Sequence, residues 1–439
     1  LHMVNLSAGS DLRVENVVFA DAWDRQNPDD YITVEALHLD AATDEGEPGG
    51  YPVDGTPCRN VSVVGCTFTN VFAGVGTHHV VAGSIFNDLT VANCTFVKLK
   101  SYAVHAYGMT DCDVFDSYAE DCAGFMRSSS SECRVYGNQV LTMRESAFYD
   151  GGSRIAVSSN VVHGCGVAGT VAAHGIYAVG SSFQVVDNEI WDVTGCGIRA
   201  DSGSSVKSDG NTIVRSSIHG FSFTGGSSLE SVSDAVSLSG GSGFIVADGG
   251  IASISNSAVI SPSSVGIQID GIERGEIRDC TVGSAGSHGI VLNNGSSSSV
   301  FGNVISDSVG HGVIVVGGSA DLGRNIISVP GGNGVTAERM ARLAASGNTI
   351  TGGQYGFCVK PDCSLSAEGN TITGTSLSAV YAISAGAVTC ACNVVTSPGN
   401  CGFYMDQTAG ASIKGNSVNG SGWSGVWIRT SPACEVSGN

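Results

Sequence analysis

A short motif, an asparagine followed two positions later by an apolar residue, recurs at nearly constant spacing along this chain. From Asn188 onward every step is 22 or 23 residues. The position is held by Asn138, Asn160, Asn188, Asn211, Asp234, Ser257, Cys280, Asn303, Asn325, Asn348, Asn370, Asn393, Asn416 and Asn439. A repeat of this length predicts a stack of structural units, because each unit buries its apolar side only against its neighbours.

A second mark, glycine followed by Ile, Val or Phe, keeps the same period from Gly175-Ile176 to Gly425-Val426. Between the two marks lie short runs of alternating apolar residues, rich in Val and Ile and separated by Gly, Ser and Asn. This is the pattern of short strands joined by turns, and no helical period is visible. The sequence therefore predicts an all-β solenoid of about 17 coils.

The recurring asparagine suits a turn, because it adopts left-handed backbone angles and its amide can bond the equivalent residue one coil away. Counting backward, we expect Asp116, Cys94 and Cys66 to hold this ladder position and Asn16 to start it. Cys66 and Cys94 would then be neighbours, close enough for a disulfide. The simpler interpretation is that most of the 15 cysteines are small apolar core residues.

The repeat resembles the right-handed parallel β-helix superfamily of pectate lyases, polygalacturonases, other β-helical glycoside hydrolases, alginate epimerases and phage tailspikes. The resemblance covers the whole chain and implies a single-stranded right-handed parallel β-helix. No family motif is matched in full. Gly310-His311-Gly312 is similar to a polygalacturonase element but lacks the paired aspartates on the preceding coil. Tyr355-Gly356-Phe357 is similar to the start of an epimerase motif, but Cys358 and Val359 replace its Asp and Pro.

The formal charge of −20 excludes a nucleic-acid partner, since such binding draws its affinity from clustered Lys and Arg. No run approaches the ~18 apolar residues that a membrane span needs, so we expect no membrane insertion. The chain enters the repeat at once, from Leu1 to Leu6. We therefore expect the natural N-terminus to lie upstream, and a secreted or cell-surface protein.

We predict one β-helix domain over residues 1–439, with a decorated part over 24–202 and a regular scaffold over 203–439. The three longer coils all fall in the first part, around 41–57, 79–87 and 166–173. Long excursions from an economical solenoid tend to lie on its binding face.

Side-chain direction can be predicted by aligning the strands on the glycine mark, because alternate residues face outward. The expected outward pairs in the decorated part are His38 and Asp40, Gly76 and His78, His105 and Tyr107, Met126 and Ser128, Tyr149 and Gly151, Tyr177 and Val179, and Arg199 and Asp201. Two charged residues, Arg127 and Asp150, fall in the core phase. We expect them either to pair with each other or to be turned into a cleft.

Paired carboxylates on adjacent coils would suit glycoside hydrolysis, which needs two of them flanking one bond. Asp40 beside His78 is the first candidate for a catalytic carboxylate, with Glu35 or Asp54 as the other. The candidate substrate-binding residues are His38, His78, His105, Tyr107, Arg127, Tyr149, Asp150, Tyr177, Arg199 and Asp201. Because cations are few in this acidic region, we expect a neutral or amino-sugar-containing oligo- or polysaccharide.

Other functions stay open at this point. A calcium-assisted polysaccharide lyase is the alternative enzyme, and the acids Asp44, Glu45, Glu47 and Asp54 could hold such an ion. We nevertheless expect neither a cofactor nor a bound metal. A glycan-binding adhesin or tailspike-like solenoid without enzymatic activity is the third hypothesis, and the oligomeric state is open.

Overall fold

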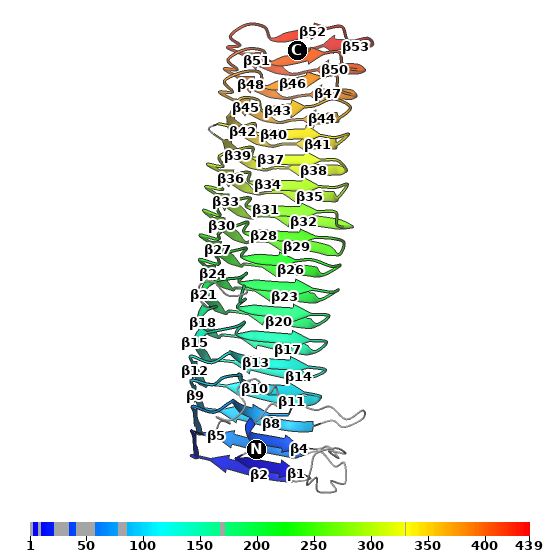
Figure 1. Cartoon of the computed structure of the whole chain (residues 1–439). Helices are drawn as coiled ribbons and strands as arrows, with labels where there is room; N and C mark the ends of the chain where they lie inside the picture. Colours follow the sequence, from blue (N-terminus) through cyan, green and yellow to red (C-terminus); the bar gives the residue numbers. More distant parts are fainter. Residues whose placement is uncertain are drawn as a thin grey trace. The chain divides into compact units, whose positions relative to one another are not determined.

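The computed structural model describes residues 3–7, 10–21, 35–40, 58–77, 86–166, 172–329 and 331–439. These residues form 53 strands, and they contain no helix (Figure 1). In the same residues, no helix is long and apolar enough to cross a membrane. The chain divides into two compact units, Leu1–Ser217 and Ile218–Asn439.

Unit 1 consists of three parallel sheets, and the chain visits them in turn on every coil. The first sheet holds β1 (Val4–Ser7), β4 (Glu35–Asp40), β7 (Ala73–Gly76), β10 (Tyr102–Tyr107), β13 (Gly124–Ser129), β16 (Phe148–Gly151), β19 (Ile176–Val179) and β22 (Ile198–Asp201). The second holds β2 (Ser10–Glu15), β5 (Arg59–Val64), β8 (Phe86–Ala92), β11 (Met109–Phe115), β14 (Glu132–Tyr136), β17 (Arg154–Ser158), β20 (Ser182–Val186) and β23 (Ser205–Asp209). The third holds β3 (Val18–Ala20), β6 (Thr67–Thr69), β9 (Thr95–Val97), β12 (Tyr118–Glu120), β15 (Gln139–Met143), β18 (Val161–Cys165), β21 (Glu189–Val193) and β24 (Thr212–Val214).

Unit 2 repeats this arrangement in the described residues after 217. Its first sheet holds β25 (Phe221–Phe223), β28 (Phe244–Ala247), β31 (Ile267–Asp270), β34 (Ile290–Asn293), β37 (Val313–Val316), β40 (Val335–Glu338), β43 (Phe357–Val359), β46 (Val380–Ile383), β49 (Phe403–Asp406) and β52 (Val426–Arg429). The second holds β26 (Ser228–Val232), β29 (Ile251–Ser255), β32 (Arg274–Arg278), β35 (Ser297–Phe301), β38 (Ser319–Gly323), β41 (Arg342–Ser346), β44 (Ser364–Glu368), β47 (Ala387–Ala391), β50 (Gly410–Lys414) and β53 (Cys434–Ser437). The third holds β27 (Ala235–Ser237), β30 (Ala258–Ile260), β33 (Thr281–Gly283), β36 (Val304–Ser306), β39 (Ile326–Val329), β42 (Thr349–Gly352), β45 (Thr371–Thr373), β48 (Val394–Thr396) and β51 (Ser417–Asn419).

The expected fold class is confirmed: the described residues form a right-handed parallel β-helix, with a coil count close to the roughly 17 expected. The asparagine ladder is confirmed too. In both units the amide Nδ2 of one asparagine donates to Oδ1 of the asparagine on the next coil, at 2.8–3.0 Å. The same Nδ2 also donates to a backbone carbonyl of the preceding coil, as Asn348 does to Leu322 at 3.0 Å. The buried amide is thereby satisfied, which a polar group in a core requires.

The phase expected at the start of the ladder is wrong by one residue. Ser117, not Asp116, holds the position before Asn138, because its backbone N–H donates to Asn138 Oδ1 at 3.0 Å. Asp116 is the turn residue before it, with φ +48°. Asn16 is likewise a turn residue with φ +54°. Cys94 is in the ladder as expected, since its N–H donates to Ser117 Oγ at 3.1 Å.

The interior of unit 1 is filled by residues stacked in register on successive coils. Phe19, Phe68 and Phe96 form one such column, with ring centroids 4.7 and 4.9 Å apart. The cysteines behave as expected of small apolar residues: they are free thiols, and all except Cys392 and Cys434 are buried. The core therefore consists of like-sized side chains repeated along the coil axis.

Candidate functional site

The outer face of the first sheet of unit 1 carries one column of aligned residues. Parallel pairing brings into register His38, Gly76, His105, Arg127, Tyr149, Tyr177 and Arg199. Residues in register on neighbouring parallel strands lie about 4.8 Å apart, so the side chains of the column lie along one line on this face. The column brings most of the predicted substrate-binding residues onto one face.

A buried carboxylate lies at the β4 end of this column. Glu35 is fully buried, and its Oε1 lies 3.1 Å from Nδ1 of His105. Its Oε2 lies 3.2 Å from Nδ1 of His38. Both histidines are buried as well, at 6% and 3% exposed for His38 and His105. A carboxylate taken out of water needs such partners, because an unpaired buried charge is strongly destabilising.

The strand between the two histidines has no side chain at the position in register with them. That position is Gly76 on β7, with φ +150°. A Cβ on this residue would overlap the backbone carbonyl of His105. Only glycine therefore allows β7 to approach His105 this closely.

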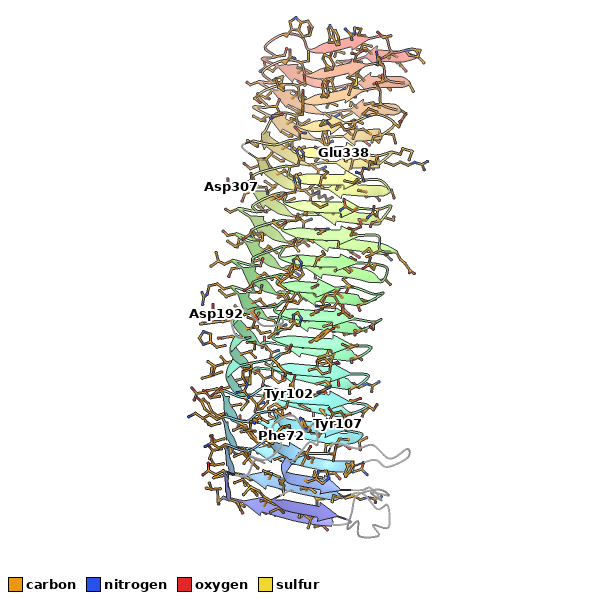
Figure 2. All side chains as sticks on the ribbon, in the orientation of Figure 1. Phe72, Tyr102, Tyr107, Asp192, Asp307 and Glu338 are labelled. Carbon is orange, nitrogen blue, oxygen red and sulfur yellow. The ribbon has the colours of Figure 1, made fainter. Side chains whose placement is uncertain are left out.

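Ser101, Tyr102 and Tyr107 lie around His105, with the ring centroids of the two tyrosines 6.1 and 6.0 Å from that of His105. Ser101, in the turn before β10, places its Oγ 3.2 Å from Nε2 of His105. The backbone N–H of Ser101 donates to the carbonyl of Phe72 at 2.7 Å. Figure 2 shows Phe72, Tyr102 and Tyr107 on neighbouring coils. Burial raises the pKa of Tyr107, so its half-buried phenol stays protonated at neutral pH.

Beyond His105 the column becomes a strip of cations and rings. Arg127 is exposed, and its guanidinium lies 5.2 Å from the centroid of the Tyr149 ring. Tyr149 and Tyr177 meet edge to face at 5.4 Å. In the described part of the chain, Arg127 forms no ion pair. Stacking on the Tyr149 ring holds the Arg127 side chain in place.

The far end of the column is a neutralised cluster. Asp201 Oδ2 accepts hydrogen bonds from the Tyr177 hydroxyl at 2.9 Å and from Nε of Arg199 at 2.9 Å. His174, which is not among the predicted site residues, contacts the Tyr177 ring, with a centroid distance of 5.1 Å. Burial and the nearby Arg199 lower the pKa of His174 to about 4. Its Nδ1 accepts the backbone N–H of Cys196 at 2.9 Å, so His174 is neutral at pH 7.

Two predictions at the Arg127 coil are wrong. Gly124-Phe125 has the sequence of the glycine mark but lies one residue before the true start of the strand. The strand pairing shows this, since Met126 is in register with Val104 and Phe148. Met126 and Ser128 are therefore buried, and Arg127 points outward. Arg127 does not pair with Asp150.

Asp150 is not a substrate-binding residue, because it is fully buried in the core. Its carboxylate accepts hydrogen bonds from the hydroxyl of Ser128 at 2.5 Å, from the hydroxyl of Ser181, and from the backbone N–H of Ser153 at 3.1 Å. These donors compensate its burial and give it a structural role.

The remaining predicted residues are only partly described. The backbone of Asp40 pairs with Ser7 at the end of β4, but its side chain lies outside the described part, as do Asp54 and His78. The acidic segment proposed for calcium also lies outside it. Within the described residues, no group of three His, Cys, Asp or Glu side chains could hold a metal ion. Glu35 itself is buried between two imidazoles, which does not suit a carboxylate that must contact a glycosidic bond.

The family model described as "Right handed beta helix region" matches residues 51–213, 174–327 and 320–439 of the chain. No curated protein sequence matches this chain. Among solved structures, two point mutants of the periplasmic alginate epimerase AlgG align over 78% of this chain and 78% of theirs. Their identities are 13% and 12%, with TM-scores of 0.32 and 0.30. At these values the two structures carry no functional argument.

Proposed function

Because the chain belongs to the right-handed β-helix family, and because one face of unit 1 aligns a buried His–Glu pair with an exposed Arg and half-buried Tyr side chains, we propose that it is a carbohydrate-active enzyme. The substrate is an oligo- or polysaccharide lying across β10, β13, β16, β19 and β22. The single observation that carries the proposal is the in-register column from His105 to Arg199.

The column matches the chemistry of a sugar chain. Tyr149 and Tyr177 are half-buried rings that can pack against the apolar face of a pyranose, as aromatic rings do at binding surfaces. Arg127 offers donors to hydroxyl or carboxylate groups. Arg199 is already neutralised by Asp201, so among the described residues of the column Arg127 is the one cation outside an ion pair. This favours a glycan with an isolated acidic group over a uniformly charged polyuronate.

The proton-transfer group of the site is His105. Glu35 can only accept a hydrogen bond when ionised, so Nδ1 of His105 carries a proton, and Nε2 is the nitrogen left to take up or give a second one. That arrangement is the one a general base needs, with the second nitrogen held by a carboxylate.

Glycoside hydrolysis by paired carboxylates remains our proposal for cleavage of the sugar backbone, with Asp40 and Asp54 as the pair. β-Elimination is the alternative, and Arg127 beside His105 favours it, because elimination requires a cation near the sugar carboxylate and a base.

Incubation with a panel of neutral, amino-sugar and uronate polysaccharides distinguishes the two. Reducing ends without ultraviolet-absorbing unsaturated products indicate hydrolysis, and unsaturated products indicate elimination. Binding without turnover across the panel would support the glycan-binding adhesin instead.

A further inference from the structure

Three side chains of the site form a continuous hydrogen-bonded chain, and neither form of sugar-backbone cleavage gives a role to its first member, Ser101. Ser101 Oγ lies 3.2 Å from Nε2 of His105, and Nδ1 of the same ring lies 3.1 Å from Oε1 of Glu35. A hydroxyl, an imidazole and a carboxylate connected in this order through the two ring nitrogens constitute the arrangement of a serine hydrolase. We propose that Ser101 is the nucleophile in the hydrolysis of an ester, that His105 is its general base, and that Glu35 positions His105.

Burial along the chain follows the order that this chemistry requires. Glu35 is fully buried, His105 is 3% exposed, and Ser101 is half-buried in the turn before β10. The Glu35 carboxylate, which has to be shielded from water, is the innermost group. The Ser101 hydroxyl, which has to contact the substrate, is the outermost. His38, on the second oxygen of Glu35, further restrains the carboxylate. Because Nδ1 of His105 donates to Glu35, the lone pair of Nε2 is directed at the Ser101 hydroxyl.

The reaction balances with water as the only co-reactant. Ser101 Oγ attacks the carbonyl carbon of the ester while its proton passes to Nε2 of His105. The carbonyl carbon–alkoxy oxygen bond then breaks, and the alcohol leaves with the proton from His105. Water attacks the acyl-serine, again giving a proton to His105. The carboxylic acid leaves, and the Ser101 hydroxyl is restored.

The position of Ser101 indicates the class of ester. It lies in the turn before β10, where its hydroxyl meets His105, the residue in register with Arg127, and its backbone N–H donates to the carbonyl of Phe72 on the preceding coil. A small acyl group on a sugar hydroxyl fits this arrangement, with the sugar over the rings and the acyl group at Ser101. That the ester is carried on a glycan rests on the proposed function, whereas the ester chemistry at Ser101 does not.

The full chain can be tested with p-nitrophenyl acetate and with a fluorophosphonate probe. We expect turnover of the ester and one covalent adduct, found by mass spectrometry on the peptide that contains Ser101. Ser101→Ala should abolish both. The matched control is Ser129→Ala, on the neighbouring strand, where the hydroxyl only donates to the carbonyl of Gly151. This control should retain both, and unfolding midpoints of the two variants should agree with that of the unchanged chain.

The positioning role of Glu35 needs a separate measurement, because a buried residue also affects folding. Glu35→Gln should lower kcat by ~10³-fold or more with KM within about twofold, and Glu35→Asp should restore part of kcat.

Ester hydrolysis unchanged in Ser101→Ala, or an adduct elsewhere, overturns the inference. Acetate release from an O-acetylated polysaccharide, measured beside glycan binding, separates the two proposals. Turnover of p-nitrophenyl acetate without glycan binding contradicts only the proposed function, and glycan binding without any ester turnover contradicts only the role of Ser101.

Discussion

Glu35 on β4 and His105 on β10 are 70 residues apart in sequence, yet their side chains lie 3.1 Å apart in the buried part of the outer face. The strand between them, β7, has only glycine at the position in register with His105. Three successive coils, those of β4, β7 and β10, therefore have to be stacked correctly for the two side chains to meet. The pair provides the first place where the site can be tested.

Gly76→Ala should disrupt this pair. The added Cβ would overlap the His105 carbonyl, and φ +150° is unfavourable for any residue with a Cβ. We expect a loss of about 2–4 kcal/mol in the free energy of unfolding and of most activity. Denaturant unfolding checks the stability. Gly151→Ala is the control, since a Cβ there meets nothing within 4 Å, and equal stability loss in both variants would contradict the role of Gly76.

Arg127→Ala should weaken substrate binding more than catalysis. The guanidinium is exposed, rests on Tyr149 and is in register with His105, so its removal takes away a charged donor to the glycan. We expect KM to rise about 10-fold or more, the effect of losing one charge-assisted hydrogen bond. Arg154→Ala removes another exposed arginine, from the second sheet, and should leave KM unchanged. A drop in kcat with constant KM would instead place Arg127 in the chemical step.

Asn348→Ala should destabilise unit 2 without touching the site. The Asn348 amide donates to Asn370 Oδ1 and to Leu322 O, and its own Oδ1 accepts two N–H groups of Asn325. Removing it leaves several buried groups unpaired, at a cost of about 2–4 kcal/mol. Guanidinium unfolding followed by circular dichroism measures this cost. The exposed Asn419→Ala, outside the ladder, should change the unfolding free energy by less than about 0.5 kcal/mol.

Stability should fall on acidification below about pH 6.5. The Nδ1 atoms of His219, His288 and His311 each accept a backbone N–H of the next coil at 3.0 Å, and burial lowers the pKa of each. A lowered folded-state pKa means that the unfolded chain binds more protons below its own pKa. The three neutral histidines therefore contribute fully to the free energy of unfolding above pH 6.5. This contribution is lost as the pH falls through their folded-state pKa values.

The same rule applies to His174 in unit 1, whose pKa of about 4 corresponds to a contribution of about 3 kcal/mol. Unfolding free energies measured between pH 7.5 and 4 should show the slope. In His311→Asn, which retains a side-chain acceptor, the slope should be smaller. An identical slope would assign the pH dependence to the carboxylates.

Much of the site was predictable because side-chain direction alternates along a strand. His105, Tyr149, Tyr177 and Arg199 are outward residues both in the prediction and in the structure. Arg127 was misplaced because Gly124-Phe125 imitates the start of a strand one residue early, and a single residue reverses every side chain of a strand. Ser101 gave no signal, since a serine in a turn is ordinary in this serine-rich chain and only its distance from His105 distinguishes it.

The sequence by itself determined the coil: its period, its asparagine ladder, its buried cysteines and the parallel β-helix all follow from a repeat that each coil carries locally. The tertiary structure alone decided which side chains on different coils meet. Ser101, His105 and Glu35 come together because coils of unequal length are stacked in register, and that register is set by packing and backbone hydrogen bonding between coils. A periodic pattern specifies the strand that each residue occupies, but contact between residues of unlike coils depends on how the irregular coils are accommodated.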